Sequence, residues 1–154
     1  MEFTVEEQEL FMREALIEAQ TAADHDEVPI GAVLVGFDRK LIARSFNRRE
    51  LDQCATHHAE INVIEEANRI VGNWRLLDCA LFVTVEPCLM CAGAISLARM
   101  PEVYYGAANP KFGAVESLYQ VLQDDRLNHR LQVESGILEI ECAAVMQNFF
   151  RNRR

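Results

Sequence analysis

The sequence has few of the features that mark membrane, fibrous or disordered proteins. Its 154 residues include no apolar run long enough to cross a bilayer, only 7 glycines and only 4 prolines. Residues 1–7 are acidic and lack the apolar stretch of a secretory signal, so we expect a cytoplasmic protein with no membrane partner. The five cysteines are an odd number, and two of them lie three residues apart. This usage fits metal chemistry in a reducing compartment better than a set of disulfides.

Positive charge is also scarce. The chain has 15 lysines and arginines against 24 aspartates and glutamates, a net charge of −9. Such a field repels nucleic acid beyond about one Debye length, roughly 10 Å. The charge is unevenly spread, however, because residues 151–154 hold three arginines and Arg48, Arg49 and Lys111 fall in expected loops. The net charge therefore does not exclude a local basic rim on an acidic protein.

The hydrophobic pattern predicts one α/β domain over residues 1–154, with three layers in the order α/β/α. A hairpin comes first, and a later strand–helix–strand unit requires two parallel strands, so the five-stranded sheet is mixed with helices on both faces. Thr4 with Glu7 forms a capping box, and Thr56 is the expected N-cap of the second helix. The expected helices cover 5–23, 57–71, 87–99, 115–122 and 138 onward, and the expected strands cover 28–35, 41–46, 79–85, 103–105 and 131–133.

Cys88 and Cys91 carry the clearest chemical signal. Placed on the first turn of a helix after Pro87, they share one face, and the positive helix end favours thiolates. With the imidazole of His58 they give zinc three protein ligands and leave the fourth position for water, as in catalytic sites. Structural thiols or a redox pair are the alternatives, but a redox pair needs no distant His-x-Glu.

Glu60 is the expected catalytic carboxylate beside that water. His58 is preferred to His57 as the ligand because only His58 has a glutamate two residues later, whereas His57 caps the helix or lines the rim. Residues two apart on a helix point about 200° apart, so His58 and Glu60 cannot both bind a metal from one helical face. Glu60 therefore needs to reach the water and not the metal.

The order H-x-E…P-C-x-x-C is the signature of zinc nucleobase deaminases. Around it, the sequence resembles the bacterial tRNA-specific adenosine deaminase family over nearly its whole length. The segments that carry the resemblance are 27–33, 46–47, 58–61, 85–94, 128–130 and 149–151. The two zinc motifs are shared by all cytidine-deaminase-like enzymes, and the other segments narrow the likeness to the tRNA enzymes.

This resemblance implies hydrolytic deamination of adenosine to inosine at the wobble position of a tRNA anticodon. One Zn²⁺ per subunit would be held by His58, Cys88 and Cys91, and Glu60 would move the proton. The subunits would form a homodimer with its edge near the CxxC helix and the following loop. The implied nucleoside contacts are Asn47, Val28 and the backbone of Ala59, and the implied anticodon-loop contacts are Arg48, Asn109, Lys111, Phe149 and Arg151.

Several alternatives remain at this point. From the residues alone, Asn47 fits ordinary turn chemistry as well as substrate binding, and Phe149 and Arg151 fit a packed and solvated helix end. Asn109 stands where the family often has aspartate, which could loosen discrimination between ribose and deoxyribose. The whole chain could instead be a zinc deaminase of a free base or nucleoside, of guanine or cytidine type. A non-catalytic zinc or RNA-binding module is the third reading, and the spare Glu60 argues against it.

Overall fold

The frame of the structure is a mixed five-stranded sheet. The computed structural model describes residues 2–153. The strands lie in the order β2-β1-β3-β4-β5, in which β1 is antiparallel to β2 and β3, whereas the β3–β4 and β4–β5 pairs are parallel. The strands are β1 (Gly31–Gly36), β2 (Leu41–Phe46), β3 (Cys79–Val85), β4 (Glu102–Ala107) and β5 (Gln132–Glu134). The mixed sheet predicted from the sequence is confirmed.

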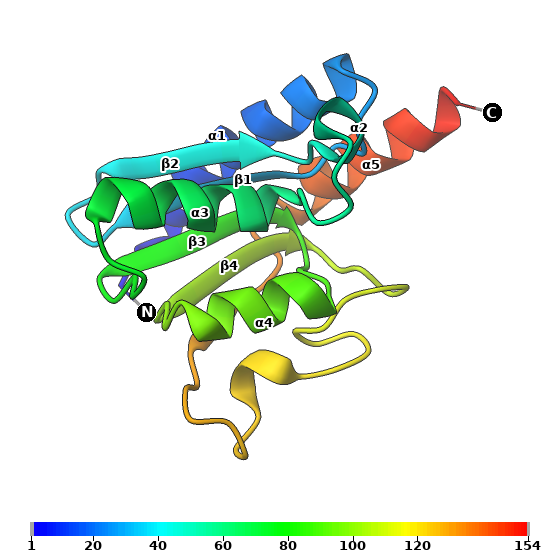
Figure 1. Ribbon diagram of the computed structural model, residues 1–154. Helices are drawn as coiled ribbons and strands as arrows, with labels where there is room; N and C mark the ends of the chain where they lie inside the picture. The colour runs from blue at the N-terminus through cyan, green and yellow to red at the C-terminus, as the bar shows by residue number, and fades with distance from the viewer. Residues whose placement is uncertain (1, 154) are drawn as a thin grey trace.

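Helices cover both faces of this sheet. Figure 1 shows α3 and α4 on one face and α1 and α5 on the other. The helices are α1 (Val5–Asp24), α2 (Arg49–Asp52), α3 (Ala59–Val71), α4 (Leu89–Leu97) and α5 (Glu139–Arg151), with a 3-10 helix η1 (Val121–Gln123). None of the helices within residues 2–153 combines the length and apolar character that crossing a bilayer requires. The expected three-layer α/β/α arrangement is confirmed.

Two hydrophobic cores hold the layers together. Val63 of α3 and Ile95 of α4 are buried in one core with Leu81 of β3. On the other face, the Phe82 and Tyr104 rings stack with their centroids 4.5 Å apart. Because both faces of β3 are covered, the strand is buried at every position, which is why its sequence is a continuous apolar run.

The start of α1 agrees with the sequence prediction, whereas the start of α3 does not. The Thr4–Glu7 capping box is present, with the Glu7 amide donating to Thr4 Oγ1 at 3.2 Å and the Thr4 amide donating to Glu7 Oε1 at 2.9 Å. The predicted Thr56 cap is wrong, because α3 begins at Ala59 with His58 as its N-cap. Its expected end at Gly72 is confirmed, with this glycine in the left-handed region.

The start of the first strand and the segment after the hairpin also differ. The strand begins at Gly31, three residues later than predicted, because the Ile30 amide donates to the Val28 carbonyl at 2.9 Å and Pro29 has no amide to pair. A Cβ at Gly31 would lie 2.0 Å from the Ala15 carbonyl oxygen, so only glycine lets α1 approach β1 this closely. The expected loop after the hairpin contains the short helix α2.

The helix predicted over 115–122 is absent. The chain makes turns over 114–117, and only η1 is helical in this region. The amides of Val115, Glu116 and Ser117 donate to the Glu86 carboxylate instead of to carbonyls four residues earlier. A long-range carboxylate has thus replaced the local helical hydrogen bonds.

Candidate metal and active site

The candidate site lies at one end of the sheet, where β3 and β4 finish and α3 and α4 begin (Figure 1). Ligands of α/β sheets bind beyond the carboxyl ends of parallel strands. The N-termini of α3 and α4 both lie here, and each brings partial positive charge and unpaired amides. The two helix N-termini therefore favour thiolates and anionic ligand groups at this end of the sheet.

His58, Cys88 and Cys91 converge in this position. Their ligand atoms lie within 4.8 Å of one another, and His58 Nδ1 is 3.5 Å from each of the two sulfurs. A tetrahedral zinc ion with bonds of about 2.3 Å to sulfur and about 2.0 Å to nitrogen would separate these atoms by roughly 3.5 Å. The donor set and its spacing fit a zinc ion with three protein ligands. No other such group of histidine, cysteine and carboxylate side chains occurs in the described part of the chain.

The local backbone explains how these residues meet. Cys88 is the N-cap of α4 and not part of its first turn as predicted, because the helix begins at Leu89, whereas Cys91 does lie on that turn. His58 is likewise an extended N-cap, with φ −73° and ψ 155°. The 200° separation expected for His58 and Glu60 therefore does not apply, since only Glu60 is helical.

The pKa values of the Cys88 and Cys91 thiols are shifted in opposite directions. A hydrogen bond from Cys91 and a second one from His58 lower the pKa of Cys88 to about 4 against the opposing effect of burial. Contact with Cys88 and burial raise the pKa of Cys91, so the thiol proton resides there. Metal ligation requires both thiolates, and binding would therefore displace the Cys91 proton.

Glu60 lies in the first turn of α3 and is only 4% exposed. Burial raises the pKa of this carboxyl to about 7, although its own backbone amide and His58 favour the charged form. A carboxyl with a pKa near neutrality can both accept and return a proton, which is the property of a general acid–base group.

Asn47 and Val28, two of the expected nucleoside contacts, are brought together. Asn47 follows β2 and is 5% exposed, and its Nδ2 donates to the Val28 carbonyl at 3.4 Å. Its Oδ1 is buried without a hydrogen-bond partner among residues 2–153. Native proteins leave few buried acceptors unpaired, and such an atom often indicates a ligand position. Ala59, the third expected contact, is fully buried at the start of α3 between His58 and Glu60.

Arg48 is held on the adjacent segment. Its guanidinium donates to both carboxylate oxygens of Asp52 at 3.0 and 3.1 Å and lies over the Phe46 ring at 5.2 Å. His57 contacts the same Asp52 through Nδ1 at 2.8 Å. His57 does not cap α3, because the N-cap of that helix is His58. Arg48, Asp52 and His57 contribute to a groove of about 600 Å³ between β2 and α3, which the three metal-site residues do not line.

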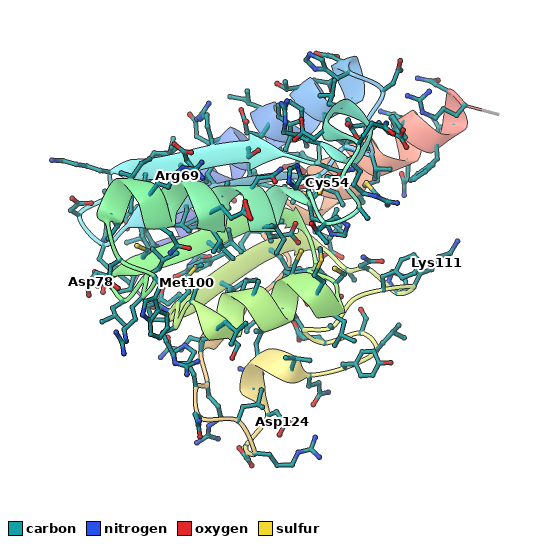
Figure 2. All side chains as sticks on the ribbon, in the orientation of Figure 1. Cys54, Arg69, Asp78, Met100, Lys111 and Asp124 are labelled. Atoms are coloured by element: carbon teal, nitrogen blue, oxygen red, sulfur yellow. The ribbon has the colours of Figure 1, made fainter. Side chains whose placement is uncertain are left out.

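Asn109 and Lys111 lie on the loop that follows β4. Lys111 is exposed near the tip of this loop, and Figure 2 places it at the end of the molecule where α4 begins. Gly113 of the same loop forms a β-bridge with Cys88, which ties the loop to the metal site. Glu86, to which the sequence pattern gave no role, has a buried carboxylate that accepts hydrogen bonds from this loop. The available signal was an acidic residue between an apolar strand and Pro87.

Phe149 and Arg151 are on the last turns of α5. Phe149 lies below the Arg153 guanidinium at 3.9 Å and lines a groove of about 350 Å³ between the ends of α1 and α5. Arg151 is exposed and contacts Asn148. Both side chains lie at the surface near the C-terminal end of α5.

Known proteins share this fold. The family model of the MafB19-like deaminases matches residues 6–154. A solved structure described as a study of A-to-I editing by tRNA:A34 deaminases at the wobble position of transfer RNA has a TM-score of 0.84 and 50% identity, covering 88% of this chain and 97% of that one. A guanine deaminase structure from Nitrosomonas europaea has a TM-score of 0.81 at 22% identity, covering 92% and 83%, a likeness of fold alone. The fold and the site are those of a deaminase.

Two curated relatives match nearly the whole chain. The tRNA-specific adenosine deaminase of Streptococcus pyogenes serotype M1 is 56% identical over 154 residues, covering 100% of this chain and 90% of that protein. The enzyme of the same name from Bacillus subtilis is 49% identical over 146 residues, covering 95% and 90%. The chain belongs to the tRNA-specific adenosine deaminase family.

Proposed function

We propose that this protein is a zinc-dependent hydrolase that converts adenosine to inosine at the wobble position of tRNA anticodons. The observation that carries the proposal is the convergence of His58, Cys88 and Cys91, of which Cys91 is buried and the other two are half-buried, with the buried Glu60 carboxyl two residues after His58 in the chain. Family membership over the whole chain supports the adenosine and tRNA parts of the assignment.

The residues present suit a catalytic zinc ion in each subunit. Three ligands leave one coordination position for water, whereas a structural site is closed by four. A zinc ion held here would supply Lewis-acid activation of water near neutral pH. The role of the protein is to fix the two sulfurs and the imidazole nitrogen at the ends of two helices.

Glu60 carries the proton in this mechanism. It accepts a proton from the attacking water and delivers it to N1 of adenine as the oxygen bonds to C6. The C6–N6 bond then breaks as Glu60 passes the second proton of the water to the amine, which leaves as ammonia, and inosine remains with the first proton on N1. Burial keeps the pKa of Glu60 close to 7, which suits both directions of transfer.

The substrate contacts divide into two groups. The Asn47 amide, the Val28 carbonyl region and the Ala59 backbone hold the flipped nucleoside, and the buried unpaired Oδ1 of Asn47 is the best support for this group. The second group faces the anticodon loop from three separate segments. It comprises Arg48, Asn109, Lys111, Phe149 and Arg151.

We also propose that the protein is a homodimer of single-domain subunits. It acts on tRNA in the cytoplasm. The outer face of α4 supports the homodimer, because Leu97 is 69% exposed, Leu89 is exposed and the space above Gly93 is open. An apolar face of this kind on a helix beside the active site fits a second copy of the chain. Sedimentation equilibrium of the zinc-loaded protein should give twice the 17.5 kDa chain mass, and a single-chain mass would remove this part.

Mass-resolved deamination tests the central proposal. The zinc-loaded protein, with zinc quantified in the same sample, is given an anticodon stem-loop, free adenosine, free cytidine and free guanine. We expect a one-dalton mass gain and ammonia release with the stem-loop. Turnover of only the free bases or nucleosides would favour the free-base deaminase reading, and no turnover of any substrate would favour the binding module.

A further inference from the structure

Glu86 is a buried carboxylate that the proposed mechanism does not use. It follows β3, precedes Pro87 and Cys88, and is only 2% exposed. Its two oxygens accept five hydrogen bonds from the loop after β4. The donors to Oε1 are the Asn109 amide at 3.1 Å and Ser117 Oγ at 2.5 Å, and the donors to Oε2 are the amides of Val115 at 3.1 Å, Glu116 at 2.8 Å and Ser117 at 2.9 Å.

The bonding pattern makes this loop dependent on Glu86. A buried carboxylate without partners costs several kcal/mol, and four buried or half-buried amides without an acceptor are costly as well. Because residues 114–117 form turns and not a helix, these amides have no helical carbonyl partners to replace the carboxylate. The charge and the loop therefore stabilise each other.

Gly113 packs closely against the Glu86 carboxylate. A Cβ at this position would lie 2.4 Å from Glu86 Cδ and 2.6 Å from the Asn109 carbonyl oxygen. The Gly113 amide donates to that carbonyl at 2.7 Å, and the Ala114 amide donates to the Pro87 carbonyl at 2.9 Å. The loop thus closes around the carboxylate while it pairs with the chain that leads into Cys88.

We infer that Glu86 is a positioning residue that holds loop 109–117 beside the metal site, so that Asn109 and Lys111 present a preformed surface to the anticodon loop. The inference rests on the proposed function for its ligand. Glu86 acts through the loop, since its contacts are with loop amides and a loop hydroxyl. Its loss should therefore weaken substrate binding more than the chemical step.

Glu102 provides a matched control. It is also a buried glutamate, 6% exposed, and it accepts the Glu2 amide at 2.8 Å and the Tyr104 hydroxyl at 2.5 Å. It lies at the start of β4, at the end of the sheet where Figure 2 labels Asp78 and Met100, away from Lys111. Glu102→Gln makes the same chemical change in a buried site without touching the loop.

The test compares Glu86→Gln, Gly113→Ala and Glu102→Gln as zinc-loaded proteins. We expect Glu86→Gln to raise KM for an anticodon stem-loop about tenfold, with kcat within twofold and zinc content unchanged, because one wall of the binding surface is displaced. Gly113→Ala keeps the carboxylate but disturbs the same fit, so it should reproduce the rise in KM. Glu102→Gln should leave KM unchanged.

Hydrogen exchange of the amides at 109 and 115–117 supplies a readout that does not depend on turnover. We expect faster exchange there in Glu86→Gln and Gly113→Ala and wild-type exchange in Glu102→Gln. An unchanged KM, unchanged loop exchange, or an equal rise in KM in Glu102→Gln would overturn the inference. If the wild-type protein fails to deaminate the stem-loop, the proposed function is wrong, and the exchange measurement alone still decides whether Glu86 holds the loop.

Discussion

Replacing Asn47 by leucine separates a binding role from a structural role. The side chain is buried and makes one long hydrogen bond, from Nδ2 to the Val28 carbonyl at 3.4 Å, while its Oδ1 has no partner among residues 2–153. The Val28 carbonyl also accepts the Ile30 amide at 2.9 Å, so it stays paired in the variant. An apolar side chain of similar shape therefore removes an unpaired buried acceptor at little structural cost.

The magnitudes follow from these contacts. A buried unpaired acceptor costs about 1–3 kcal/mol, so we expect Asn47→Leu to unfold with a free energy equal to wild type or up to about 2 kcal/mol higher. If Oδ1 accepts a hydrogen bond from the nucleoside, its loss should lower kcat/KM about 10- to 100-fold. The variant should thus be as stable as wild type and much less active.

The measurements are urea unfolding of the zinc-loaded protein and steady-state deamination of a stem-loop. Asn62→Leu is the control, because the Asn62 amide donates to the Phe46 carbonyl at 3.0 Å. That variant should lose about 1 kcal/mol of stability with kcat/KM unchanged. A loss of more than about 2 kcal/mol in Asn47→Leu with kcat/KM unchanged would refute the reasoning and make the amide structural.

Four further predictions concern the chemistry, the RNA surface and the pH dependence. Glu60→Gln should lower kcat by about 10²- to 10⁴-fold while zinc content stays at the wild-type level, and full activity in this variant would contradict the proton-transfer role. Lys111→Ala should raise KM for the stem-loop and reduce the salt dependence of binding by about one counterion; an unchanged salt slope would exclude a phosphate contact. Hydrogen bonds from Arg39 lower the pKa of Glu7 from 4.5 to about 2, so this pair stabilises the fold above pH 4.5 and its contribution is lost as the pH falls from 4.5 towards 2. The difference in melting temperature between wild type and Glu7→Gln should shrink over that interval, and a constant difference would show that the carboxylate is not responsible. Asn109→Asp keeps the oxygen that accepts the Phe112 amide at 3.2 Å, so the loop should persist while the ratio of RNA to DNA stem-loop turnover rises; an unchanged ratio would exclude an effect of this amide on sugar discrimination.

The elements and the metal group could be predicted from the sequence because their signals are local. The apolar run of residues 79–85 identifies a strand covered on both faces, and the three-residue spacing of Cys88 and Cys91 identifies a paired ligand. Glu60, two residues later, distinguishes His58 from His57, and the structure brings the His58 ring to both sulfurs. Residue type and short spacing carried all of this information.

The loops could not be predicted because long-range contacts determine them. Residues 115–117 donate to a carboxylate about 30 positions earlier in the chain, which removes the helix that their local sequence favours. The start of α3 at Ala59 is set in a similar way, since His58 must leave the helix to face the two cysteines. A helical spacing rule therefore raised a difficulty for Glu60 that the extended cap removes.

The distribution of charge bears on how an acidic protein binds RNA. Arg48 and Arg153 are already held by aspartates at 2.8–3.0 Å, so their charge is partly neutralised before any phosphate arrives. Lys111, Arg49 and Arg151 form no ion pair within the described residues. At about 0.7–0.9 counterions per phosphate contact, three such cations would give a logarithmic salt slope between about −2 and −3. A slope this shallow would mean that contacts between the flipped base and its pocket supply most of the binding free energy. A slope of about −4 would fit five contacts, with Arg48 and Arg153 leaving their aspartates for phosphates.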